Sequence, residues 1–201
     1  LRDKLAKELE EKTGIKFGLL IGRQTNVASF MRHLLVGRFE SSVAAFQSSL
    51  EYMIQSSEHI LKWVDKRHKI PIYKKGNLPD VSDFYNTSND AWDEIQEAFE
   101  KYESKGFFEI DMKYVRNDFV ADVKSDLQLL RNLREQWFGK DNTIHFDPKL
   151  NSFIEIVREQ MRCDPNRKLI VFSEYADTAN YLGKSLQEAG LPVMKYTSAD
   201  A

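Results

Sequence analysis

Apolar side chains recur at alternating intervals of three and four residues between positions 36 and 64. This period places them on one face of a helix, so it predicts a long amphipathic helix over residues 36–64. An average spacing of about 3.5 residues also predicts a second helix packed nearly parallel or antiparallel along it. Pro71 opposes continuation of the helix, as do Gly76 and Pro79. The row consists of Val36, Phe39, Val43, Phe46, Leu50, Met53, Ser57, Ile60 and Val64, with Ser57 as its one polar member.

A second row of the same kind predicts the partner helix, over residues 116–138. Its apolar members are Val120, Val123, Leu127, Leu130 and Trp137, and Arg134 interrupts them. We expect this helix to lie antiparallel to the first. Two further helices are expected over residues 1–13 and 90–105, from their helix-forming composition and capping residues. Residues 106–114 (GFFEIDMKY) alternate loosely, and the pattern leaves a strand and a loop equally open.

The pattern changes at residue 147. Asp147 is a suitable N-cap and Pro148 suits the first helical position, so together they predict the start of another helix. Residues 169–172 form an unbroken apolar run, which is typical of a strand covered on both faces. Asp177 can cap a helix that follows, and residues 191–196 (LPVMKY) supply a second strand.

These elements predict a mainly α protein with two domains. Residues 1–146 form a helical bundle with long antiparallel helices, and residues 147–201 form a small C-terminal α/β unit, strand-helix-strand. A parallel sheet needs several such units, so this one is incomplete. We therefore expect Val171 and Val193, at its edge, to be poorly covered, because a two-stranded remnant is marginally stable alone.

Composition and charge narrow the class of protein. Hydrophobic residues make up 42% and charged residues 30% of the chain, which supports a packed core under a charged surface. The net charge of -2 argues against a wholly basic surface but is compatible with a local basic strip. Cys163 is the one cysteine, so it excludes an internal disulfide and fits a reducing, cytoplasmic location. No stretch approaches the roughly 20 apolar residues of a membrane span, and we expect no membrane partner.

No catalytic constellation is visible in the sequence. The four histidines are scattered, without cysteine or carboxylate at metal-ligand spacing. There is no G-x-S-x-G elbow for a nucleophile and no G-x-x-x-x-G-K-[ST] loop to hold the phosphates of ATP. We therefore predict no catalytic residue, no metal site and no cofactor site in this chain.

A polar cluster at Arg38, Glu40, Ser41 and Ser42 interrupts the strongest apolar row. Two interpretations stay open. In one, Arg38 pairs with a nearby carboxylate, and Ser41 or Ser42 donates a hydrogen bond back to its own helix. In the other, the cluster contacts another domain or a nucleic-acid phosphate.

Residues 34–53 (LLVGRFESSVAAFQSSLEYM) resemble the "LL-x-RFESS-x-x-AF" segment of bacterial helicase-related ATPases in the Swi/Snf-like branch of helicase superfamily two. Residues 147–160 (DPKLNSFIEIVREQ) and 167–182 (RKLIVFSEYADTANYL) are similar to the entry of the second RecA-like lobe in that family. The resemblance covers most of residues 25–70 and 145–198. Residues 70–145 carry no motif of the family, so their helices are interpreted from pattern alone.

The resemblance implies that the chain is a fragment of a larger ATP-dependent helicase or translocase. The phosphate loop and the acidic Mg²⁺ motif of such enzymes belong to a first lobe, before Leu1, and the arginine-finger motif follows later in the second lobe, after Ala201. The leucine at position 1 fits this interpretation. ATP and Mg²⁺ are thus implied for the parent, a nucleotide-binding hydrolase, and the fragment itself is predicted to be inactive.

The implied function of the fragment is mechanical: it links and positions the two motor lobes on double-stranded nucleic acid, expected to be DNA. Functional loops gather at the carboxyl ends of parallel strands. The residues predicted to contact nucleic acid are therefore Ser173, Glu174 and Tyr175 after the first strand, Thr197 and Ser198 after the second, and Arg38 from the polar cluster. The alternative is a helical protein-interaction module without any motor role.

Overall fold

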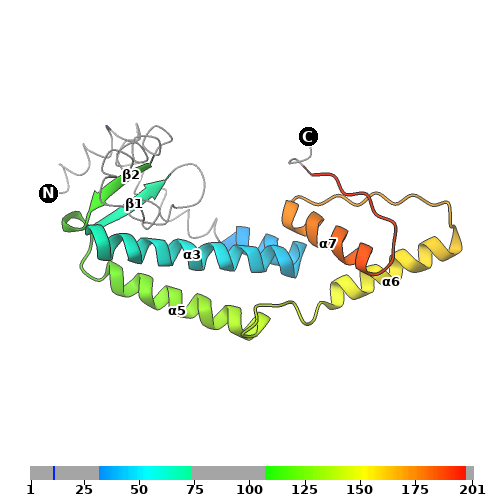
Figure 1. Cartoon of the computed structure of the whole chain (residues 1–201), viewed down its shortest axis with the longest axis horizontal. Helices are drawn as coiled ribbons and strands as arrows, with labels where there is room; N and C mark the ends of the chain where they lie inside the picture. The colour runs from blue at the N-terminus through cyan, green and yellow to red at the C-terminus, as the bar shows by residue number, and fades with distance from the viewer. Residues whose placement is uncertain (1–10, 12–31, 74–106, 198–201) are drawn as a thin grey trace, which may run out of the picture. The chain divides into compact units, whose positions relative to one another are not determined.

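The computed structural model describes residue 11 and residues 32–73 and 107–197 (Figure 1). These residues are mainly helical, as predicted, with one small two-stranded antiparallel sheet. The helices predicted over residues 1–13 and 90–105 lie outside the described residues, apart from residue 11. No helix within the described ranges is long and apolar enough to cross a membrane. The elements are a helix over residues 32–41, α3 (Val43–Arg67), β1 (Lys69–Tyr73), β2 (Phe107–Asp111), the short 3₁₀ helix η2 (Met112–Tyr114), α5 (Phe119–Phe138), α6 (Pro148–Cys163) and α7 (Ala176–Glu188).

The chain divides into two compact units. The first unit comprises Leu1–Ser29 and Glu51–Leu133, and the second comprises Phe30–Leu50 and Arg134–Ala201. The division falls within α3 and within α5, so each helix contributes to both units. Each unit is described by itself below.

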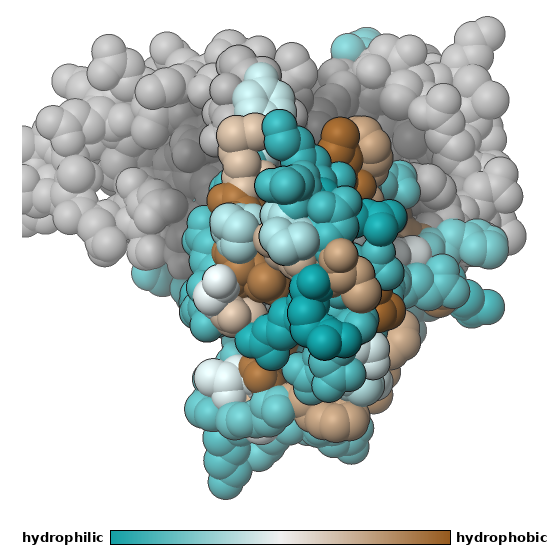
Figure 2. All heavy atoms as spheres, turned by 90° about the vertical axis from the view of Figure 1, so that its right-hand side faces the viewer, coloured by the Kyte–Doolittle hydropathy of each residue, from teal (hydrophilic) through white to brown (hydrophobic). Residues whose placement is uncertain are grey.

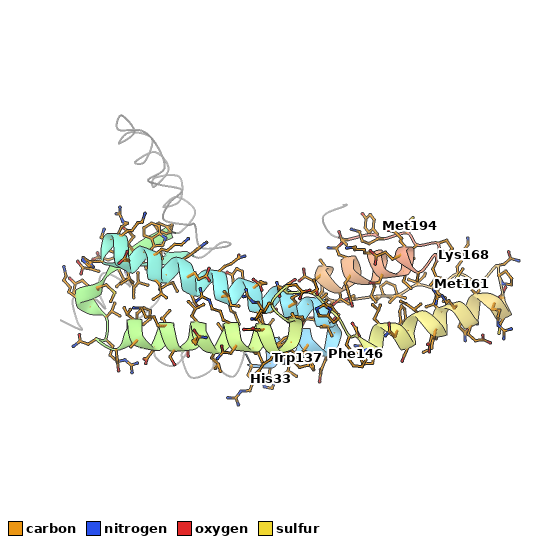
Figure 3. The ribbon with its side chains drawn as sticks, turned by 60° about the horizontal axis from the view of Figure 1, so that its bottom comes forward. His33, Trp137, Phe146, Met161, Lys168 and Met194 are labelled. Atoms are coloured by element: carbon orange, nitrogen blue, oxygen red, sulfur yellow. The ribbon has the colours of Figure 1, made fainter. Side chains whose placement is uncertain are left out.

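In the first unit, α5 lies antiparallel beside α3, as the spacing of its apolar residues predicted (Figures 1 and 3). Ile54, Trp63 and Leu127 are buried in this unit. On the surface of the pair, Arg131 Nη2 of α5 donates to Glu58 Oε1 of α3 at 2.6 Å. Ser57, the polar member of the apolar row, donates its hydroxyl to the Met53 carbonyl at 2.9 Å, which allows a serine on this face.

The hairpin of β1 and β2 completes the described part of the first unit. Residues 69–73 were not predicted as a strand, whereas residues 107–111 were one of two alternatives. Lys69 pairs with Asp111 and Tyr73 with Phe107 at the two ends of the antiparallel register. Pro71 is tolerated because each strand of a two-stranded sheet has an unpaired edge, where a missing N–H costs little.

Two contacts hold this hairpin to α3. The Phe107 ring lies 5.4 Å from the Trp63 ring, and neither side chain is exposed to more than 3%. The Glu109 carboxylate forms ion pairs with Arg67, whose Nε donates at 2.7 Å, and with Lys69, whose Nζ donates at 2.8 Å. His68, between them, has a φ of 53°, so α3 ends in a left-handed residue that turns the chain into β1.

The second unit corrects the prediction of one helix over residues 36–64. The helix over residues 32–41 ends before Ser42, and α3 begins after it. An aromatic cluster spans this break: Phe39 lies 5.2 Å from Phe46 and 5.1 Å from Trp137, between ring centroids. Phe46 also contacts Phe138, which is fully buried. Three members of the two apolar rows, Phe39, Phe46 and Trp137, therefore meet here, as their spacing predicted, and Phe138 joins them from outside the rows.

The C-terminal region forms both predicted helices, α6 and α7, but neither predicted strand. Residues 168–172 and 191–197 have no regular secondary structure among the described residues. A strand is defined by its pairing with another strand, and the strand pairing found among the described residues is that of β1 with β2. Of the two edge residues expected to be poorly covered, Val171 is 53% exposed, whereas Val193 is half-buried.

The contact of Trp63 with Phe107 gives a stability prediction for the first unit. Replacing the fully buried Trp63 with alanine should lower the free energy of unfolding by about 3–5 kcal/mol, because a large cavity remains. Tyr52→Ala on the same helix is the control, since Tyr52 is 45% exposed and its loss should cost less than about 1 kcal/mol. Chemical denaturation measures both. Similar values for the two variants would contradict this account of the core.

Candidate functional site

Arg38 joins the helix over residues 32–41 to the first turn of α7. Its Nε donates to the Ala45 carbonyl at 3.0 Å, and its Nη2 forms an ion pair with Asp177. The guanidinium also lies over the ring of Tyr175, 5.1 Å from the centroid. An arginine with partners in three directions is held in one rotamer, so Arg38 fixes the start of α7 against the break at Ser42.

Three hydroxyl groups form the buried part of the same contact. Thr178 Oγ1 lies 2.8 Å from Ser41 Oγ and 2.8 Å from Ser42 Oγ. Ser42 Oγ also accepts the Ala45 amide at 3.0 Å, which makes Ser42 the N-cap of α3. Ser42 and Thr178 are 6% and 4% exposed, so these bonds are shielded from water. We call Arg38, Ser41, Ser42, Asp177 and Thr178 the α7 junction.

The start of α6 also contacts the break. Lys149 Nζ donates to the carbonyls of Glu40 and Ser41, the latter at 3.1 Å. These carbonyls end the helix over residues 32–41, where a cation is favoured by the helix dipole. Lys149 therefore supplies partners for carbonyl groups that the helix break leaves without an intrahelical amide.

Asp147 connects α6 to α7. Its carboxylate accepts the Leu150 amide at 2.9 Å, which confirms its predicted role as N-cap, and Pro148 is the first helical residue. Tyr181 donates its hydroxyl to the second carboxylate oxygen at 3.1 Å. Burial, followed by the negative charge of Asp147, raises the pKa of Tyr181 well above its ordinary value. Tyr181 therefore remains a protonated donor.

A cavity of about 590 Å³ opens beside the α7 junction. The apolar residues Leu150, Phe153, Ile156 and Leu182 line it, together with Lys149 and the junction residues Ser41, Ser42 and Thr178. The residues after the predicted first strand, including Ser173 and Glu174, form part of its wall.

The structure brings together two of the residues predicted to contact nucleic acid, Arg38 and Tyr175. Ser173 lies in the turn beside them: its Oγ donates to the Tyr175 carbonyl at 3.2 Å and accepts the Tyr175 amide at 3.3 Å. Glu174, between them, is exposed, and Thr197 is half-buried. Ser198 lies outside the described residues.

The sequence missed the partners that define the junction. A carboxylate partner for Arg38 was one of the two alternatives, but Asp177 is 139 positions away rather than nearby. Ser42 caps α3 instead of donating back to its own helix. The predicted cap of α7 was wrong, because Tyr175 is the N-cap residue and Asp177 lies in the first turn. The roles of Thr178 and Lys149 were not predicted, because a threonine or a lysine near the start of a helix is common and does not indicate a contact.

The chemistry of the junction is that of a structural contact. The partners of its hydroxyls are one another and a backbone amide, not a base that would activate a nucleophile. In the part of the chain that the structure describes, no group of three histidine, cysteine or acidic residues is placed to hold a metal ion. Gly37 permits the close contact, because a Cβ added there would lie 3.1 Å from the Tyr175 hydroxyl.

Comparisons with protein-family models, curated proteins and solved structures found no match for this chain.

The buried hydroxyl cluster gives the prediction for this site. Thr178→Val keeps the shape of the side chain but leaves two serine hydroxyls without their partner, so it should lower the free energy of unfolding by about 1–3 kcal/mol. Thr178→Ser keeps the hydroxyl and loses one methyl group, which costs about 0.8 kcal/mol. Chemical denaturation ranks the two variants. A valine variant more stable than the serine variant would show that Thr178 acts by apolar packing alone.

Proposed function

We propose that this chain is a non-catalytic part of an ATP-dependent nucleic-acid helicase or translocase, in which it links and positions two motor lobes. One observation supports the proposal most directly. Two of the three stretches that carry the resemblance, residues 34–53 and 167–182, contact each other through the α7 junction, although Arg38 and Asp177 are 139 positions apart. Two distant motifs that bind each other are expected if both belong to one mechanical element.

In this proposal, residues 147–201 begin a second RecA-like lobe. The segments at 168–172 and 191–197 would become strands when further strands lie beside them. ATP and Mg²⁺ would be bound by other parts of the parent enzyme. Its partner would be double-stranded DNA, and its location would be the cytoplasm.

The contacts of the α7 junction change the role that we propose for Arg38. The guanidinium of Arg38 already has a carboxylate, a carbonyl and an aromatic ring as partners, so we assign it to holding Tyr175 in place rather than to a phosphate. The turn of Ser173, Glu174 and Tyr175 is then presented by a fixed support. A stiff contact of this kind would pass lobe closure on ATP to the helical part of the chain.

A helical protein-interaction module is the second candidate. The exposed aromatic residues of the second unit favour it: Phe39 is 41% and Trp137 is 46% exposed, and Val36 is 49% exposed. Aromatic residues open to solvent are enriched at protein interfaces.

Binding of a fluorescently labelled DNA duplex to the chain distinguishes the two candidates. The motor proposal predicts no ATP hydrolysis by this chain and weak DNA binding that falls steeply with salt concentration. Glu174→Lys should strengthen the binding and steepen the salt dependence by about one unit of slope, because it adds a cation at the proposed contact. Glu135→Lys, at an exposed position of α5, is the control and should have a smaller effect.

Three results would contradict the motor proposal. Rapid ATP turnover by the chain would place catalytic residues in it. Equal effects of the two lysine variants would remove the turn from the DNA contact. Loss of DNA binding on Trp137→Ala, together with no gain in binding on Glu174→Lys, would assign the contact to the aromatic surface instead.

A further inference from the structure

Nothing in the local sequence ends the helix at Ser42. The chain has no proline and no glycine between Arg38 and the end of α3, and the apolar row keeps its spacing of three and four across the break. The described residues other than glycine with a positive φ are His68 and Asn142, so Ser42 has no left-handed backbone. Away from proline and glycine, sharp kinks arise mostly where a side chain enters the helical hydrogen-bond ladder. The side chains around Ser42 therefore hold the cause of the break.

Helical hydrogen bonds run up to the break from both sides. The Ser42 amide donates to the Arg38 carbonyl at 3.1 Å, and the Phe46 amide donates to the Ser42 carbonyl at 3.1 Å. Both bonds join residues four positions apart, as in an α-helix. A continuous helix makes three more such bonds between these two, from the amides of residues 43–45 to the carbonyls of residues 39–41. The break thus concerns three hydrogen bonds.

Side chains occupy groups that would make these three bonds. Lys149 donates to the carbonyls of Glu40 and Ser41, and the Ala45 amide donates to Ser42 Oγ at 3.0 Å. Two of the three carbonyls and one of the three amides therefore have partners that a continuous helix would replace. Lys149 belongs to α6, and the Ser42 hydroxyl is hydrogen-bonded to α7. The two C-terminal helices thus keep the helix broken.

The break bends the chain back on itself. In a straight helix, residues seven positions apart are separated by about 10 Å along the axis. Arg38 Nε nevertheless donates to the Ala45 carbonyl at 3.0 Å, and the ring centroids of Phe39 and Phe46 are 5.2 Å apart. Figure 1 shows the helix over residues 32–41, in blue, beside the first turns of α3 rather than in line with it. Closing the three bonds would therefore swing this helix away from α3.

α6 and α7 are joined to each other as one body. Tyr181 donates to Asp147 at 3.1 Å, and Arg158 Nη2 donates to the Ala189 carbonyl at 2.9 Å. Figure 2 views the second unit from the side at which α6 ends, and polar residues lie among apolar ones on that surface. Such a surface is solvated wherever the pair lies, so displacing α6 and α7 costs the contacts of the α7 junction and of Lys149.

The aromatic contact across the break opposes a swing only in part. Phe39 and Trp137 are 41% and 46% exposed, so straightening the helix uncovers only the remainder of their surface. Apolar stabilisation is roughly proportional to the area removed from water. This contact therefore resists the swing less than a contact between fully buried side chains would.

We propose that the break at Ser42 is a conformational switch with two states. In one state, Lys149 and the α7 junction hold the helix broken, as in this structure. In the other state, α6 and α7 have moved away, the three missing hydrogen bonds form, and the helix over residues 32–41 continues into α3. A displacement of the C-terminal pair is thereby converted into a swing that carries Phe39 away from Trp137. The switch does not depend on a motor function.

Spin labels on the two sides of the break test the switch in the whole chain. His33→Cys and Ser48→Cys, both at exposed positions, carry the labels, and Cys163→Ser removes the natural thiol. In a continuous helix the two labelled backbones are about 22 Å apart, whereas the bend brings them closer. Electron paramagnetic resonance measures this distance and should find the shorter one in the otherwise unchanged chain.

The release variant combines Ser42→Ala with Lys149→Met, which frees the amide and the carbonyls that these side chains occupy. It should show a second population at the longer distance, near about 22 Å. The matched control, Ser152→Ala with Lys184→Met, makes the same replacements at exposed positions of α6 and α7 and should keep the shorter distance alone. Adding Val43→Pro to the release variant should cancel the second population. Proline is tolerated at the first position of α3 but removes an amide that a continuous helix requires.

Hydrogen exchange separates straightening from local unfolding. Val43 and Ala44 begin α3, and amides in the first turn of a helix lack carbonyl partners within that helix. A continuous helix supplies these partners, so exchange at both amides should slow in the release variant. Unfolding of the break would instead quicken it.

Any of three results would overturn the switch. A release variant with the same single distance as its control would show that the bend does not depend on these side chains. Faster exchange at Val43 and Ala44 would show that the break unfolds rather than straightens. A longer distance that persists after Val43→Pro would assign the movement to something other than a continuous helix.

Discussion

The hydroxyl of Ser42 meets two requirements at once, and the arrangement of the second unit follows from them. It accepts the Ala45 amide, which starts α3, and it shares a hydrogen bond with Thr178 in the first turn of α7. Both requirements are met only if the helix over residues 32–41 ends at Ser42 and α7 begins directly against that end. Because the cluster is buried, a shift of α7 would leave hydroxyl groups unpaired away from water, at a cost of about 1–3 kcal/mol each.

The surrounding contacts make this arrangement specific. Arg38 spans the break from the Ala45 carbonyl to Asp177, and Lys149 covers the carbonyls at the helix end. Across the same break, the rings of Phe39, Phe46 and Trp137 pack edge to face. The break is thus held by a polar contact and by an aromatic one. Both contacts are needed to fix the angle at which the helix over residues 32–41 meets α3.

The sequence predicted the elements that depend on local pattern and missed those that depend on distant partners. The two apolar rows identified α3 and α5 because a helix repeats its burial every three or four residues, and Asp147 with Pro148 marked the start of α6. The break at Ser42 was missed, since the apolar row continues through it and the partner, Thr178, is 136 positions away. The strand at residues 69–73 was missed because its pairing partner, β2, is distant, and the predicted strands at 169–172 and 191–196 lack a described neighbour to pair with. At the candidate site, the sequence identified Arg38 and Tyr175 as site residues. It could not predict that they contact each other, because they are far apart in the chain.

A double-mutant cycle on Arg38 and Asp177 tests the central claim, that the α7 junction holds α7 to the helix break. Arg38→Ala, Asp177→Ala and the double variant are unfolded by denaturant, and hydrogen exchange of the α7 amides is followed in each. We expect a coupling free energy of about 1 kcal/mol, since the Arg38 side chain is only 18% exposed, and faster exchange in α7 for both single variants. Effects that add to within about 0.3 kcal/mol, with unchanged exchange in α7, would contradict the account.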